Sequence, residues 1–140
     1  MAGYSSTPLP KKLGIKAGHL VALVEAPPGI ERTLGDMPED VKLVRGTRAS
    51  RAFDVILLFA KSSSMVEKRI AELASKLDHA GGLWVCWPKR ASGIVSDLGD
   101  NEVRAFGLEI GLVDNKVCAV DETWSALRFM YRLKDRPPRR

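Results

Sequence analysis

The segment FDVILLFAKSSSMVEKRIAELASKLDHAGGLWVCWP, residues 53–88, decides the fold because it joins two apolar runs through an amphipathic stretch. Phe53–Ala60 is apolar at every position except Asp54, as a strand covered on both faces requires. Leu83–Pro88 is a second run of the same kind. Two such strands joined by a helix form a β-α-β unit, whose strands are expected to lie parallel.

The stretch between the two runs has the spacing of a helix. Its apolar residues recur at intervals of four, three and four, which places on one stripe Val66, Ile70, Leu73 and Leu77. Ser64 and Glu67 match a capping box at the start of this helix. Gly81 and Gly82 are predicted to end it.

The residues before this unit predict two more strands with a short helical segment between them. His19–Glu25 is largely apolar and is predicted to be a strand, stopped by the proline-rich turn that follows it. Ile30–Leu34 allows a turn or two of helix, and Val41–Val44 is a short strand. Residues 1–18 are expected to form an irregular lead-in, with one short turn at 11–15.

The residues after the unit predict one more helix and a closing hairpin. Val103, Phe106 and Ile110 form a helical stripe. Lys116–Val120 and Ser125–Tyr131 are strand candidates separated by a short turn, which favours an antiparallel pair. The sequence therefore predicts an α/β fold, a three-layer Rossmann-like sandwich of about six strands in a mostly parallel sheet with an antiparallel C-terminal hairpin.

Length and charge favour a single domain. The chain has 140 residues, of which 45% are hydrophobic and 28% charged, as in ordinary globular proteins. We expect the lead-in at 1–18, a Rossmann-like domain at 19–133 and a basic, flexible tail at 134–140. The net charge is +5, and much of the excess lies at this end of the chain. Because prolines interrupt the tail, a solvated terminus is favoured over a nucleic-acid-binding arm.

The sequence also predicts a cytoplasmic protein with reduced cysteines. No apolar run approaches the roughly 18 residues of a membrane helix, and Met1–Leu13 lacks the apolar stretch of a signal peptide. Cys86 and Cys118 lie in separate apolar runs, without a neighbouring histidine or cysteine. They are typical of buried thiols rather than of a disulfide or a metal site.

Ligands of open α/β sheets bind beyond the carboxyl ends of the strands, a rule that selects the loops 26–29, 61–64, 89–93 and 121–124. The first loop is where a nucleotide site would carry its glycines. It contains only one glycine, and Pro27 and Pro28 lack the N–H groups that a phosphate needs. In the second loop the serines are explained as helix caps.

The end of the second strand also departs from a nucleotide site. It carries Arg45, where an acidic residue normally binds ribose hydroxyls. An arginine there favours a phosphate or is simply exposed. We therefore predict no cofactor.

The remaining two loops carry the candidate ligand-binding residues, namely Lys89, Arg90, Ser92, Asp121, Glu122 and Trp124. The first three supply two cations and a hydroxyl beside a flexible glycine, which suits an anion. The tryptophan could form a wall of a ligand or partner site. The alternatives are a solvated basic loop, ion pairs between these carboxylates and cations, and a tryptophan that covers the sheet edge.

No catalytic motif accompanies this candidate site. His19 and His79 fall at the boundaries of predicted elements and belong to no triad or metal-binding pattern. The sequence contains neither a nucleophile elbow nor a P-loop. We predict no catalytic residue and no metal ligand.

Two resemblances add to this picture. The order of elements from Phe53 onward resembles the C-terminal half of S-adenosylmethionine-dependent methyltransferases, whose last strand inserts antiparallel beside its neighbour. Residues 4–16, 82–89 and 111–125 resemble a bacterial family known as domain of unknown function family 3052. This resemblance implies a soluble, single Rossmann-like domain.

Together these observations predict a non-catalytic module that binds a protein partner or a small anionic ligand at the carboxyl edge of the sheet. The alternative is a reduced S-adenosylmethionine-dependent methyltransferase-like enzyme with a non-standard cofactor site. A membrane partner is not expected, nucleic acid is disfavoured, and a homo-oligomer is left open.

Overall fold

The computed structural model describes residues 7–136 and contains a single sheet. Its elements follow in the order α1 (Leu9–Lys12), β1 (Leu20–Val24), α2 (Ile30–Leu34), β2 (Lys42–Arg45), β3 (Phe53–Phe59), α3 (Ser63–Ser75), β4 (Leu77–Pro88), α4 (Asp100–Glu109), β5 (Leu112–Ala119) and β6 (Trp124–Tyr131). Short 3₁₀ turns at Arg90–Ser92 and Leu133–Asp135 follow β4 and β6.

The sheet has six strands in the order β2-β1-β3-β4-β6-β5. The pairs β1–β2, β1–β3 and β3–β4 are parallel, whereas β4–β6 and β5–β6 are antiparallel. The predicted mostly parallel sheet with its closing hairpin is thus confirmed. After β2 the chain returns to the other side of β1, so the strand order reverses between β1 and β3.

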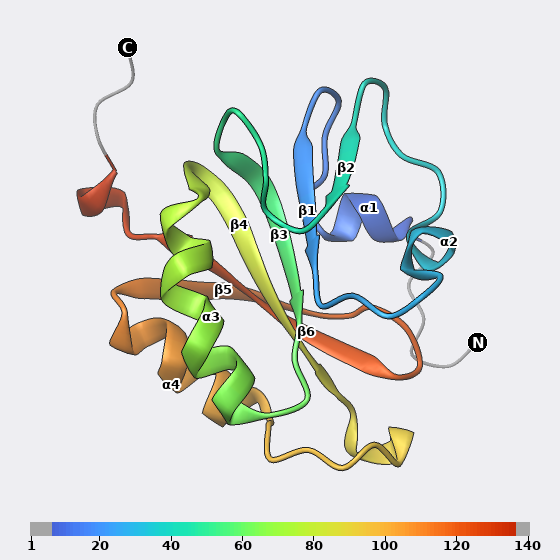
Figure 1. Cartoon of the computed structure of the whole chain (residues 1–140), viewed down its shortest axis with the longest axis vertical. Helices are drawn as coiled ribbons and strands as arrows, with labels where there is room; N and C mark the ends of the chain where they lie inside the picture. The colour runs from blue at the N-terminus through green and yellow to red at the C-terminus, as the bar shows by residue number, and fades with distance from the viewer. Residues whose placement is uncertain (1–6, 137–140) are drawn as a thin grey trace.

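Helices cover both faces of this sheet, which confirms the predicted three layers. The longer helices α3 and α4 pack on one face, while α1 and α2 lie on the other (Figure 1). Side chains of β1 alternate between the two cores: Ala22 faces α3, and Val21 and Leu23 face α2. β3 is buried along its whole length except at Asp54, whose Oδ2 accepts a hydrogen bond from Leu20 N at 2.8 Å.

Helix α3 begins and ends earlier than the sequence predicts. Its N-cap is Ser62, whose Oγ accepts from Met65 N, so the predicted capping box of Ser64 and Glu67 is wrong. The predicted stop at Gly81 and Gly82 is also wrong, because both glycines lie inside β4.

Packing explains why β4 contains these glycines. A Cβ on Gly81 would lie 2.7 Å from the backbone oxygen of Asp54, at the point where the β3–β4 register shifts. A Cβ on Gly82 would lie 2.8 Å from Cδ of Arg128 in β6. The glycines therefore let neighbouring strands approach β4 closely.

The described part of the lead-in is more regular than expected. It includes the helix α1, and the residues after it, Leu13 and Ile15, are buried in the core on the α2 side. The indole nitrogen of Trp84 donates to the Leu13 carbonyl at 3.0 Å, which ties this segment to the centre of the sheet. Most of the predicted flexible tail, residues 137–140, lies outside the described residues. Within residues 7–136, no helix is long and apolar enough to cross a membrane.

Gly107 provides a test of the packing between α4 and β6. A Cβ there would lie 2.0 Å from Cε1 of Phe129, whose side chain is fully buried. Alanine favours a helix by about 1 kcal/mol over glycine, but a clash of this depth outweighs that gain. We expect Gly107→Ala to lower the free energy of unfolding by about 2 kcal/mol in urea titrations.

The matched control is Gly99→Ala, where the new Cβ meets only the mobile Glu102 carboxylate, at 2.9 Å. This variant should lose clearly less than Gly107→Ala, about 1 kcal/mol at most, because the Glu102 side chain can move and alanine is only a weaker N-cap than glycine at the start of α4. Equal stability of Gly107→Ala and wild type would contradict the close packing of α4 on β6.

The prediction that both cysteines are buried is confirmed. Cys86 and Cys118 pair with the same residue, Ala126, from opposite sides, so they lie two strand spacings, about 10 Å, apart. That separation is too large for a disulfide. Burial raises the pKa of the Cys86 thiol well above its usual value, and burial also raises that of Cys118.

Both thiols are therefore expected to be inert in the folded protein at neutral pH, because the thiolate is the reactive form. A chromogenic thiol reagent should modify neither cysteine of the native protein within minutes, and both after unfolding in guanidinium. Rapid modification of the native protein would show that one of these strands opens.

Candidate functional site

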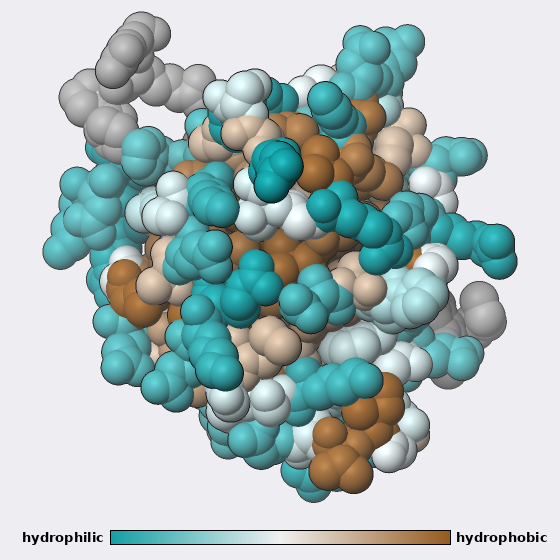
Figure 2. Space-filling model, in the orientation of Figure 1, coloured by the Kyte–Doolittle hydropathy of each residue, from teal (hydrophilic) through white to brown (hydrophobic). Residues whose placement is uncertain are grey.

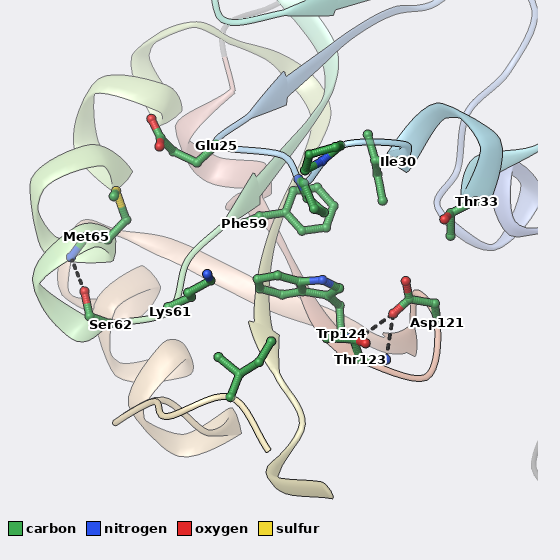
Figure 3. A pocket seen from close by; sticks show the side chains of 13 residues that line it. Glu25, Ile30, Thr33, Phe59, Lys61, Ser62, Met65, Asp121, Thr123 and Trp124 are labelled. Carbon is green, nitrogen blue, oxygen red and sulfur yellow. Dashed lines mark hydrogen bonds between the residues drawn. The ribbon is translucent and has the colours of Figure 1, made fainter. Parts of the chain in front are cut away.

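A pocket of about 620 Å³ opens at the carboxyl ends of β1 and β3, where the strand order reverses. This is the position at which open α/β sheets bind their ligands, and the volume is that of a small-molecule site. The β1–α2 loop, the start of α3, the β4–α4 segment and the β5–β6 turn all contribute walls (Figure 3). We call it the switch-point pocket.

Two aromatic rings form the floor of the switch-point pocket. Phe59, at the end of β3, and Trp124, at the start of β6, meet edge to face with ring centroids 5.1 Å apart. Figure 3 shows the two rings side by side in the middle of the lining residues. Met65 and Ile94 add further apolar surface.

The β5–β6 turn fixes the position of Trp124. Oδ1 of Asp121 accepts hydrogen bonds from the backbone N–H groups of Thr123 and Trp124, both at 2.8 Å. Lys89 holds the same turn from the end of β4: its backbone N donates to the Thr123 carbonyl, and its Nζ donates to the Asp121 carbonyl at 2.7 Å.

The β1–α2 loop, residues 25–29, forms the opposite wall. Glu25 has φ of 54°, a left-handed conformation that costs a non-glycine residue roughly 1 kcal/mol. Its carboxylate pairs with Arg69 of α3 at 3.2 Å. Pro27 and Pro28 line the pocket, and neither has a backbone N–H to offer a ligand.

Arg45, at the end of β2, braces this loop. Its guanidinium forms a two-pronged ion pair with Glu31 of α2, at 2.8 and 2.9 Å. It also donates to the carbonyls of Ala26 and Pro27, at 3.2 and 3.3 Å. The hydrogen bond from Arg45 holds the pKa of the Glu31 carboxyl below its usual value. The guanidinium of Arg45 thus stabilises the β1–α2 loop, and its donors are not free to bind a phosphate.

The structure does not bring all six candidate residues predicted from the sequence to one pocket. Asp121 and Trp124 line the switch-point pocket, and Lys89 stabilises the turn that carries them without lining the pocket itself. Ser92 makes local bonds, donating to the Lys89 carbonyl and accepting from Ile94 N. Glu122 is exposed on the turn. An ion pair of Lys89 with the Asp121 carboxylate is one of the alternatives that the sequence leaves open; the ammonium instead donates to the Asp121 backbone carbonyl.

Arg90 lies instead in a second hollow of about 810 Å³, formed largely by the β4–α4 segment, residues 89–99. Ile94 lines both hollows, so they are neighbours. Val95 in the same segment is 94% exposed. Figure 2 shows an apolar patch over this segment at the lower end of a mostly polar face.

Sequence reasoning missed Lys61, Phe59 and Met65 as pocket residues. The rule on carboxyl ends selects the loop 61–64, but there only the serines were considered, and as caps. The useful signal was the position of Lys61, two residues beyond the last strand residue, Phe59.

Comparison with known proteins establishes the fold. A SAM-dependent methyltransferase from Aquifex aeolicus has a TM-score of 0.60 at 14% identity, over 87% of each chain. The DhpI–SAH complex has a TM-score of 0.61 at 11% identity, over 90% of this chain and 83% of that one. Magnesium protoporphyrin IX methyltransferase from Synechocystis PCC 6803, with bound SAH, has a TM-score of 0.55 at 10% identity, over 83% of this chain and 75% of that one.

These likenesses show that the chain has the Rossmann-like fold of the methyltransferases. No protein-family model matches the sequence, and no curated protein is significantly similar to it. The resemblance to domain family 3052 therefore stays a prediction.

The brace between Arg45 and Glu31 predicts a pH-dependent effect. In Arg45→Ala the pKa of the Glu31 carboxyl should rise toward its ordinary value, as followed by NMR titration. Since a lowered pKa stabilises the folded state only while the carboxyl is ionised, this contribution is lost as the pH falls through the folded pKa. The stability difference between wild type and variant should therefore shrink in acid.

Arg48→Ala is the matched control, because Arg48 is an exposed arginine beyond the same strand and outside the brace. It should leave the Glu31 titration unchanged. A Glu31 pKa that is the same in wild type and Arg45→Ala would show that the ion pair does not persist in solution.

Proposed function

We propose that the switch-point pocket binds S-adenosylmethionine (SAM) or its demethylated product, S-adenosylhomocysteine (SAH), and that the protein is a reduced methyltransferase-like enzyme. The observation that carries this proposal is a pocket of about 620 Å³ at the β1–β3 strand reversal of a methyltransferase fold. Two of the similar structures were solved with SAH bound.

The lining residues suit the two ends of such a ligand. Phe59, Trp124 and Met65 offer apolar surface for a flat purine ring. Lys61 offers a cation to the amino-acid carboxylate, and Glu25 and Asp121 supply negative charge for the amine and the sulfonium. When bound, SAM supplies a methyl group on a positively charged sulfur.

The contacts that would hold the ligand are not the usual ones. The loop after β1 presents Pro27 and Pro28 instead of glycine N–H groups, and β2 ends in Arg45 instead of an acidic residue. Ribose hydroxyls therefore need partners other than the end of β2. The side chains of the pocket have to position the ligand and exclude water in place of a glycine-rich backbone.

A second candidate function is favoured by the same differences from a standard nucleotide site, namely Pro27, Pro28 and Arg45. If the prolines and Arg45 exclude nucleosides, the pocket and its neighbouring β4–α4 hollow form a non-catalytic module for a protein partner or a small anionic ligand. In that case Arg90 contributes through the second hollow, Lys89 holds the β5–β6 turn, and Ser92 stabilises the segment between them.

Calorimetric titration with SAM and with SAH separates the two candidates. Binding heat is expected for both ligands, together with a rise in melting temperature at saturating ligand, because ligands that bind only the folded state stabilise it. Absence of heat and of thermal shift at millimolar ligand would overturn the S-adenosyl assignment and leave the second candidate.

A pair of variants on α2 tests whether SAM and SAH bind in the switch-point pocket. Thr33 is exposed and lines the pocket, so Thr33→Trp should fill part of it and weaken binding at least tenfold. Arg32→Trp puts the same ring on the adjacent, exposed residue, which does not line the pocket, and should bind as wild type does. Equal affinity of both variants would place the ligand elsewhere.

A further inference from the structure

Three charged side chains line the switch-point pocket, and two of them already have partners within the protein. Glu25 pairs with Arg69 at 3.2 Å, and Oδ1 of Asp121 accepts two backbone N–H groups. The third is Lys61. Among residues 7–136 its ammonium makes no hydrogen bond and no ion pair, although it lies at the carboxyl end of the central strand.

Three other cations near this edge of the sheet are occupied by partners within the protein. Lys89 donates to the Asp121 carbonyl, and Arg69 is shared between Glu25 and Glu72. Arg45 donates its hydrogen bonds to the Glu31 carboxylate and to two carbonyls of the β1–α2 loop. Lys61 is therefore the lining cation whose charge is available to a ligand.

The surroundings of Lys61 are suited to an anion attached to an apolar body. Figure 3 shows its side chain pointing into the pocket, toward the Trp124 ring. The aromatic floor of Phe59 and Trp124 lies beside it, so a ligand can place a flat ring there and reach the ammonium with its charged group.

We infer that Lys61 is the residue that recognises the ligand's anion, and that the ligand class is a molecule with a flat ring and a carboxylate. This inference deepens the proposed function, on which the S-adenosyl form of the ligand rests. The shared chemistry is a carboxylate, which either an S-adenosyl amino acid or a simple aromatic acid could supply. The sequence predicts the small anionic ligand at Lys89 and Arg90, whereas we place its anion at Lys61.

The test compares ligand pairs that differ in the anion. SAH is paired with 5′-methylthioadenosine, which keeps the adenosyl thioether but lacks both the carboxylate and the ammonium of the amino acid, so this pair is compared by its response to the loss of Lys61. 2-Naphthoate is paired with its neutral carboxamide. Each is titrated against wild type and Lys61→Met, a variant that keeps the length of the stem and removes the charge.

Lys61→Met should weaken the binding of the carboxylate ligands about tenfold and leave the neutral partners unchanged, because a bond to a charged group is lost. Lys68→Met is the matched control, since Lys68 is an exposed lysine of α3 that does not line the pocket. It should behave as wild type with all four ligands. Both lysines are exposed, so neither variant is expected to change the melting temperature.

The outcomes separate the two proposals. Carboxylate-dependent binding of naphthoate that Lys61→Met abolishes, without any binding of SAH, would uphold the role of Lys61 and overturn the S-adenosyl assignment. Binding of SAH that Lys61→Met leaves unchanged would overturn the role of Lys61 alone. If the wild-type protein binds none of the four ligands, both proposals are wrong.

Discussion

The burial of β3 on both faces is the constraint on which the rest of this structure depends. Val55 and Leu57 face one core, Ile56 and Leu58 face the other, and none of these side chains is exposed to water. A strand of this kind is stable only at the centre of a sheet with helices on both sides. The three layers follow from it, as does the position of β1 and β4 on either side.

The same central strand also positions the site. Because β2 lies beyond β1, the connection to β3 crosses back and the loops after β1 and β3 diverge, which leaves room for a pocket at their carboxyl ends. Side chains from distant parts of the chain then close it. Phe59 and Trp124 meet at its floor, although 64 residues separate them in the sequence.

The wall formed by the β1–α2 loop distinguishes this protein from a standard nucleotide-binding domain. Its shape is maintained by an arginine at the end of β2 and by Glu25 in a left-handed conformation, with a single glycine, Gly29, at its end. The fold is that of the methyltransferases, but in this loop Pro27 and Pro28 offer a ligand no backbone N–H. Under the proposed function, ligand binding depends on the side chains of the pocket, among which Lys61 is the only cation within the described part of the chain.

Periodicity and apolar runs in the sequence by themselves determined the strands, the order of elements and the closing hairpin, because burial on both faces or on one stripe leaves a local pattern. Only the tertiary structure decided the N-cap at Ser62, the glycines inside β4 and the partners of the cations. Lys89 and Lys61 both follow central strands and look equivalent in the sequence. One meets a carbonyl of a turn formed 32 residues later and the other does not, and such pairing has no local signature.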